Sequence, residues 1–167
     1  MEPPPLPIDV TENVLDQLQA QGHLWALPIC ARVCNAWLPR CRFLIWQRVT
    51  ISSLHSLDSI RAALERTPVL RSLVSTVRLE GNYGQYPHAA PAVLLPYLAH
   101  INTWEFSGEL VIGGDRGRNL LGSLRSYAET KRLVVDACGR LISTLDVARL
   151  ACGFPGLEEL HLIDTLS

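Results

Sequence analysis

Apolar residues near the start of the chain recur at helical spacing. Val10, Val14 and Leu18 follow one another every fourth residue, and polar residues fill most of the positions between them. This spacing predicts one amphipathic helix of about three turns. Pro7 suits its first turn, where a missing N–H costs no hydrogen bond, and Gly22 suits the left-handed position at which helices commonly end.

Two more short helices are predicted before residue 48. The apolar residues of the second are Leu24, Trp25, Leu27, Ile29, Cys30 and Val33, with Pro28 near its first turn. The third places Trp37, Cys41 and either Leu44 or Ile45 on one stripe. About forty residues is close to the limit for an independent core, so such apolar helices should leave apolar surface uncovered. Either a protein partner or the rest of the chain is expected to cover that surface.

Short alternating strands replace the helical pattern from residue 48 onward. The apolar pairs that mark these strands are Val49/Ile51, Val77/Leu79, Trp104/Phe106, Leu133/Val135 and Leu160/Leu162. The first members of successive pairs lie 28, 27, 29 and 27 positions apart, with a turn and a helix between one pair and the next. The pattern predicts strands over residues 48–51, 76–81, 103–108, 132–136 and 157–162.

Four helices are expected between these strands. The first carries Leu57, Ile60 and Leu64 behind a serine cap, either Ser53 or Ser56. The other three are predicted over residues 91–100, 119–130 and 144–152. Strands that alternate with helices in this way lie parallel, with the helices covering one side of the sheet.

The period and the strand pattern resemble those of leucine-rich repeats. That family repeats about every 20–29 residues with one x-L-x-L strand in each unit. Residues 155–162 (PGLEELHL) form the best single copy, whereas the other copies are irregular and lack the usual asparagine position. The alternative is a plain α/β domain of four βα units with a parallel sheet.

The helical part carries a second resemblance. The residues concerned are Leu6-Pro7-x-Asp9-Val10, then Val14-Leu15-x-x-Leu18, then Leu27-x-x-Cys30-x-x-Val33-Cys34-x-x-Trp37. This order and spacing resembles the F-box motif, which reads L-P-x-E/D-hydrophobic, an apolar helix and V-C-R/K-x-W. The tail over residues 37–42, followed by a strand, is similar to the large F-box families of mushroom-type fungi. Asn35 departs from the family, which usually has Arg or Lys at that position.

The resemblance to F-box proteins implies a partner and a set of contact residues. It implies docking onto the Skp-family adaptor of an SCF (Skp–cullin–F-box) ubiquitin ligase, with a protein substrate held by the repeats. The matching positions, expected to divide between internal core and interface, are Leu6, Pro7, Val10, Leu15, Leu18, Leu27, Cys30, Val33, Cys34 and Trp37. A different interpretation is a repeat-only interaction scaffold whose N-terminal helices merely cap the solenoid.

The expected fold is therefore α/β, with an N-terminal three-helix F-box-like unit followed by a short leucine-rich-repeat-like solenoid of βα units. Residues 1–5 form a disordered proline-rich lead, residues 6–48 the helical domain and residues 49–167 the array of about five strands. The array stops soon after its fifth strand, so we expect that strand to have an open edge, to be less stable than the others or to meet a partner. The chain could be a truncated product.

Composition narrows the functional classes. Among 167 residues, 48% are hydrophobic and 19% charged, and the net charge of −1 gives no electrostatic basis for binding nucleic acid. The sequence lacks a secretory signal and any apolar run of about twenty residues, so neither secretion nor a membrane helix is expected. Five cysteines without a signal fit reduced thiols in the cytoplasm or nucleus.

No catalytic or cofactor site is expected. Cys30 and Cys34 lie four residues apart and could share a metal with Cys41 or His23, but without a CxxC pair we interpret them as buried structural thiols. The glycine-rich stretch over residues 113–119 lacks the lysine of a phosphate-binding loop and is interpreted as a loop between repeats. A hydrolase or a nucleotide-binding protein remains a distant alternative, because only folding could bring the scattered histidines together.

Overall fold

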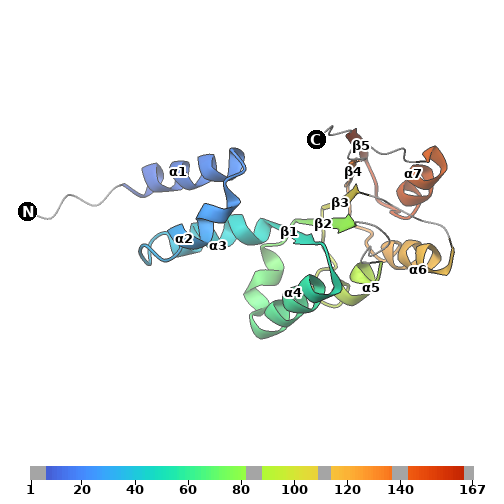
Figure 1. Ribbon diagram of the computed structural model, residues 1–167, viewed down its shortest axis with the longest axis horizontal. Helices are drawn as coiled ribbons and strands as arrows, with labels where there is room; N and C mark the ends of the chain where they lie inside the picture. Colours follow the sequence, from blue (N-terminus) through green and yellow to red (C-terminus); the bar gives the residue numbers. More distant parts are fainter. Residues whose placement is uncertain (1–6, 82–87, 109–113, 137–142, 164–167) are drawn as a thin grey trace, which may run out of the picture. The chain divides into compact units, whose positions relative to one another are not determined.

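The computed structural model describes residues 7–81, 88–108, 114–136 and 143–163 (Figure 1). Within these residues the chain forms seven α-helices and one five-stranded parallel sheet, an α/β fold. The chain divides into two compact units, Met1–Arg48 (unit 1) and Val49–Ser167 (unit 2). This division falls where the sequence pattern changes from helices to strands. Leu6 and the proline-rich lead lie outside the described residues.

Unit 1 is helical. It contains α1 (Ile8–Ala20), a 3₁₀ turn over Leu24–Ala26, α2 (Leu27–Cys30) and α3 (Leu38–Gln47). Pro7 immediately precedes α1, where its carbonyl accepts the N–H of Thr11 at 3.2 Å. The second helix is shorter than predicted, because only four residues keep α-helical hydrogen bonding.

Gly22 ends α1 as the sequence predicts. Its φ of +78° is accessible to glycine at little cost, since glycine has no Cβ. The His23 N–H donates to the Leu18 carbonyl at 2.8 Å, and the Gly22 N–H donates to the Gln19 carbonyl at 3.0 Å. This pair of bonds is a Schellman motif, which satisfies carbonyls that the end of a helix would otherwise leave unpaired.

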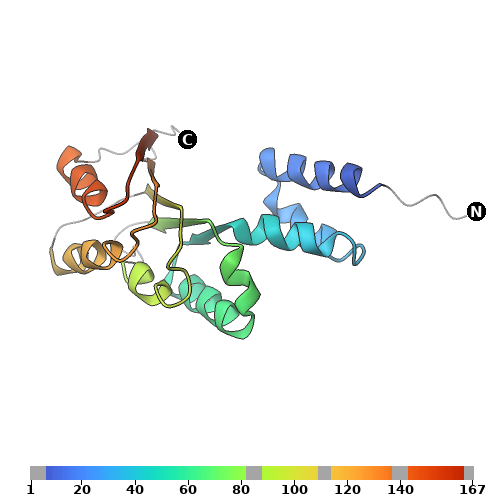
Figure 2. The same cartoon turned by 180° about the vertical axis from the view of Figure 1, so that it is seen from behind.

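Unit 2 alternates strands and helices. The strands are β1 (Arg48–Ile51), β2 (Thr76–Gly81), β3 (Thr103–Gly108), β4 (Arg132–Asp136) and β5 (Glu159–Ile163). The intervening helices are α4 (Leu54–Arg66), a 3₁₀ turn over Pro68–Ser72, α5 (Ala90–Leu94), α6 (Gly114–Leu124) and α7 (Thr144–Ala151). The strands lie side by side in chain order, and the two opposite views place the helices on one side of the sheet (Figure 2).

The predicted strand period is confirmed by the register of the sheet. Val77 lies opposite Trp104, which lies opposite Leu133, which lies opposite Leu160. The second members of the pairs align in the same way, so the apolar pairs of β2 to β5 form two continuous rows. β1 to β4 also have the predicted bounds, whereas β5 spans residues 159–163 rather than 157–162.

The helices match the predictions less closely. Ser53 caps α4 and forms a reciprocal capping box with Ser56. The helix expected over residues 91–100 ends as α5 at Leu94 and continues only as turns, because Pro96 has no N–H to extend it. The helix expected over residues 119–130 is α6, and the predicted loop before it is wrong, because α6 already begins at Gly114. Asp115 lies in its first turn, where a negative charge stabilises the helix dipole.

The core of unit 2 is aromatic at its centre. The ring of Trp104 packs edge-on against Tyr127 at 5.0 Å between centroids and stacks on Phe106 at 6.1 Å. The Tyr127 hydroxyl donates a 2.6 Å hydrogen bond to the Pro91 carbonyl, and burial raises the pKa of this phenol. Thr130, also fully buried, donates to the Ile101 carbonyl at 2.8 Å. These bonds fix the turn that follows α6 beneath the sheet.

Candidate functional site

Unit 1 exposes many large apolar side chains. They are Ile8, Val10, Val14, Leu24, Trp25, Ile29 and Val33, and we call them the exposed apolar set. Their exposed fractions run from 44% for Val10 to 70% for Trp25. Contiguous exposed apolar surface commonly marks a site that binds a protein, a membrane or an apolar ligand.

The outer face of α1 carries a shallow groove. It is lined by Val10, Asn13, Val14, Gln17, Leu18 and Gln21, which follow a three-and-four spacing along one side of the helix. The groove has a volume of about 440 Å³, and its lining is mostly apolar with amide side chains at intervals. Its lining carries no charged side chain, so a partner would bind it through apolar contact and amide hydrogen bonds.

The inner face of α1 holds a different set of residues. Leu15 is fully buried and packs with Leu27, Cys41 and Leu44 in the core of unit 1. Thr11 is also buried, and its hydroxyl bonds to the Pro7 carbonyl at 3.4 Å. Unit 1 therefore has its own core, and this core uses a side of α1 other than the apolar stripe of Val10 and Val14.

An ion pair fixes α1 against α3. The Arg40 guanidinium donates two hydrogen bonds to the Asp16 carboxylate, from Nε at 2.8 Å and from Nη2 at 2.5 Å. This carboxylate raises the pKa of Arg40 above its usual value. Arg40 also lies over the ring of Phe43, 5.3 Å from its centroid. Because the pair holds the helix from the α3 side, the exposed stripe of α1 stays on the outside.

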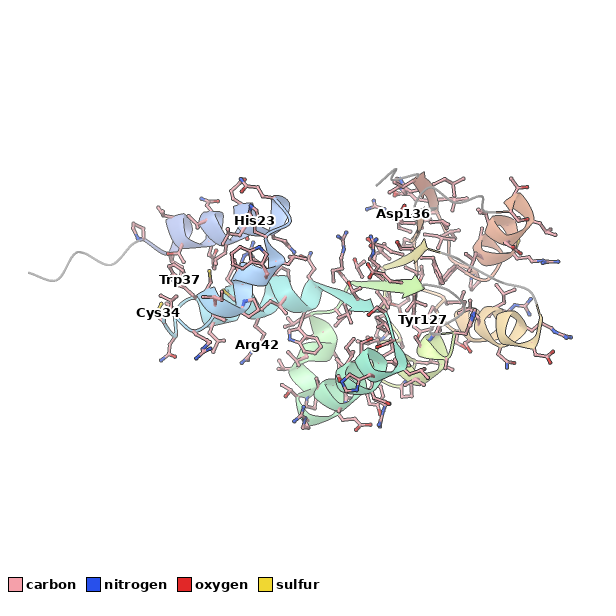
Figure 3. The ribbon with its side chains drawn as sticks, in the orientation of Figure 1. His23, Cys34, Trp37, Arg42, Tyr127 and Asp136 are labelled. Atoms are coloured by element: carbon pink, nitrogen blue, oxygen red, sulfur yellow. The ribbon has the colours of Figure 1, made fainter. Side chains whose placement is uncertain are left out.

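The structure separates the predicted contact residues into two groups. Pro7, Val10, Val33 and Cys34 are exposed, and Figure 3 labels Cys34 in the turn between α2 and α3. Leu15 and Leu27 are 0% exposed and can touch no partner in this conformation. The partly buried remainder, which packs against the core of unit 1, is Leu18, Cys30 and Trp37. Leu6 lies outside the described residues.

Sequence reasoning missed part of the exposed apolar set. The members that it did not select are Ile8, Val14, Leu24, Trp25 and Ile29. Val14 carried a usable signal, since it shares the four-residue spacing of Val10 and Leu18. Trp25 and Ile29 carried none, because their exposure depends on how the 3₁₀ turn and α2 pack on the core of unit 1.

Unit 2 presents a second candidate surface on the side of the sheet opposite the helices. There, Arg78 of β2 bonds to Glu80 at 2.8 Å and to the Ser107 hydroxyl at 2.9 Å. Its Nη1 lies 3.6 Å from Oε2 of Glu105 on β3, and its Nη2 lies 3.6 Å from Oδ2 of Asp136 on β4. Burial lowers the pKa of Arg78, but the bond to Glu80 and the surrounding carboxylates outweigh it and raise this pKa. The cluster is acidic overall and crosses three strands.

The described residues contain no group of three or more His, Cys, Asp or Glu that could hold a metal ion. Cys30, Cys34, Cys41 and Cys152 form no disulfide among these residues, and Cys138 lies outside them. Cys41 is buried as expected, which raises the pKa of its thiol, but Cys34 is exposed, contrary to the interpretation of it as a buried thiol. None of the described helices is long and apolar enough to span a membrane.

Comparison with known proteins gives no match among family models, curated proteins or solved structures.

Proposed function

We propose that this chain is an F-box adaptor, in which unit 1 docks on a Skp-family subunit of an SCF ubiquitin ligase. The observation that carries the proposal is the exposed apolar set, which lies on a unit that already has a core of its own. Here Val14 remains 49% exposed and Trp25 70% exposed.

The positions of the motif residues support the same function. Pro7, Val10, Val33 and Cys34 belong to the F-box-like motif and are exposed, which suits residues that contact an adaptor. Leu15 and Leu27 belong to the same motif and are fully buried, which suits residues that shape the unit. The motif would thus combine a scaffold and a contact surface.

Unit 2 would present the substrate. We interpret its strands, which follow one another in chain order with helices on one side, as a leucine-rich-repeat-like array. The chain itself would catalyse nothing. Its effect on the reaction would be proximity, because a substrate held beside the ubiquitin-carrying enzyme reacts at a greatly raised effective concentration. The proposed site of action is the cytoplasm, the nucleus or both.

Co-expression with a Skp-family adaptor tests the proposal. The wild-type chain should be co-purified with the adaptor at micromolar concentration, and Val10→Lys with Val14→Lys should weaken the complex. Losing well-buried interface anchors costs about 2 kcal/mol or more, which is about thirtyfold in affinity. Leu145→Lys is the matched control, since Leu145 is also exposed, at 57% against 44% for Val10 and 49% for Val14, but lies on α7 of unit 2.

The same experiment separates the adaptor from a repeat-only scaffold. A scaffold would give no complex with the adaptor, and the two lysines on α1 would leave its other interactions unchanged. Leu6→Ala with Pro7→Ala extends the test to the start of the motif. Failure of the wild-type chain to bind any Skp-family adaptor at micromolar concentration would overturn the adaptor function.

A further inference from the structure

β5 differs from the other strands because the side chains of its apolar pair are exposed rather than buried. Leu133 and Val135 of β4 are 0% and 2% exposed, whereas Leu160 and Leu162, their neighbours in the register, are 44% and 64% exposed. Ile163 is 44% exposed as well. Among the described residues β5 pairs with β4 alone, so this strand forms an edge of the sheet.

The backbone groups on that edge belong to the same two leucines. The Glu159 N–H donates to the Lys131 carbonyl of the neighbouring chain segment at 2.9 Å, so Glu159 directs its backbone groups toward β4. Successive residues of a strand direct these groups to alternate sides. Leu160 and Leu162 therefore direct theirs away from β4, and each residue combines exposed apolar surface with an outward donor and acceptor.

The edge carries few of the devices that usually prevent strands from associating. Glu159–Ile163 contains no lysine, proline or bulge, which are common protections of edge strands. The Glu159 carboxylate is already engaged, because Arg132 of β4 donates to it at 2.6 Å and His161 lies 3.2 Å away. This pairing partly offsets the charge that would repel an approaching strand.

The order of residues along β5 is self-complementary. When two copies of β5 pair antiparallel about a two-fold axis through His161, Leu160 of each copy lies opposite Leu162 of the other copy. Glu159 then lies opposite Ile163, so the two carboxylates do not face each other. Such symmetry is what a contact between two identical surfaces requires.

We propose that β5 is a self-association surface: two copies of this chain pair through antiparallel β5 strands about a two-fold axis at His161. The outward N–H and C=O groups of Leu160 in each copy form hydrogen bonds with the C=O and N–H groups of Leu162 in the other copy. The four leucine side chains cover one another on the helix side of a continuous sheet. This surface lies in unit 2 and is independent of the adaptor function proposed for unit 1.

A designed disulfide gives a positive test. In the proposed pairing the two His161 residues form a pair without mutual hydrogen bonds, whose Cα atoms lie about 4.5 Å apart, within the range that a disulfide spans. His161→Cys should therefore form a covalent dimer under mild oxidation. Ile163→Cys is the matched control, because it faces Glu159 of the second copy and should give no more cross-linking than the wild-type chain.

Sedimentation over a range of micromolar concentrations measures the association itself. The wild-type chain should shift from monomer to dimer, and Leu162→Lys should raise the dissociation constant by about tenfold or more, because a charge would lie among leucines. Leu160→Pro should do the same, since it removes an outward N–H without removing a bond to β4. Leu54→Lys on α4, also at an exposed leucine, should leave the equilibrium unchanged.

Three results would overturn the proposal. The first is a chain that stays monomeric throughout and forms no His161→Cys dimer. The second is a dimer that Val14→Lys in unit 1 abolishes and Leu162→Lys does not. The third is a monomer in which the amides of Leu160 and Leu162 exchange as slowly as those of Val77 and Leu79, because the edge would then be covered by the chain itself.

Discussion

Unit 1 and unit 2 use apolar residues in different ways. Over the described residues, unit 1 buries four apolar side chains and exposes seven large ones, whereas unit 2 buries 22 and exposes six. A small three-helix unit has too little interior for its apolar residues. In unit 2 each βα unit covers the next, so burial grows with every strand added. The contrast suggests that unit 1 is the part shaped for contact and unit 2 the part shaped for stability.

Two tryptophans provide the strongest test of this contrast. Trp104 is fully buried in unit 2 and Trp25 is 70% exposed in unit 1. Trp104→Ala should lower the free energy of unfolding by about 3–5 kcal/mol, because it leaves a large cavity. Trp25→Ala should change it by less than about 0.5 kcal/mol. Denaturant unfolding measures both, and equal losses would show that the two units do not differ as described.

Two adjacent residues of α1 sharpen the comparison within unit 1. Leu15→Ala should destabilise unit 1 by about 2–5 kcal/mol, because Leu15 is fully buried in its core. Val14→Ala should leave stability nearly unchanged and instead weaken binding of a Skp-family adaptor. Thermal unfolding followed by circular dichroism, together with the binding assay, separates the effects. A Val14→Ala variant as unstable as Leu15→Ala would place the core on the other side of the helix.

Alkaline pH should lower the stability of unit 2. Burial raises the pKa of Tyr127 in the folded state, so its stabilisation is fully present below the unfolded pKa of about 10 and is lost as pH rises beyond that value. The melting temperature of the wild-type chain should therefore fall above about pH 10. The melting temperature of the Tyr127→Phe variant should fall less steeply over the same pH range. It should start lower than that of the wild-type chain, because the variant lacks the hydrogen bond to the Pro91 carbonyl. Parallel pH profiles would contradict the assignment.

The smallest expected effect concerns the ion pair of unit 1. Arg40 and Asp16 are partly exposed, at 31% and 40% of their side chains. Asp16→Asn should cost about 0.2–1 kcal/mol at low salt, and the cost should shrink as salt screens the pair. Glu129→Gln, at a carboxylate 63% exposed beside His100 in unit 2, is a control for general charge effects. A salt-independent loss would mean that packing, rather than charge, holds α1 to α3.

The sequence alone determined the repeating architecture. Alternation of apolar and polar residues has a period of two in a strand, so five apolar pairs at even spacing were enough to place β1 to β4 and to predict that the strands lie parallel. Gly22 was equally informative, because a left-handed backbone position strongly favours glycine. These features are local, and local rules predict them.

Only the tertiary structure decided which apolar residues are covered. Val14 and Leu15 are neighbours of similar hydrophobicity, yet one is 49% and the other 0% exposed, because α2 and α3 pack against one side of α1. The early start of α6 and the burial of Glu105 beside Arg78 also depend on contacts between residues distant in the sequence. The hydrophobic effect is non-directional, so the sequence pattern identifies the apolar residues that burial would stabilise, and the packing of the helices determines which of them are buried.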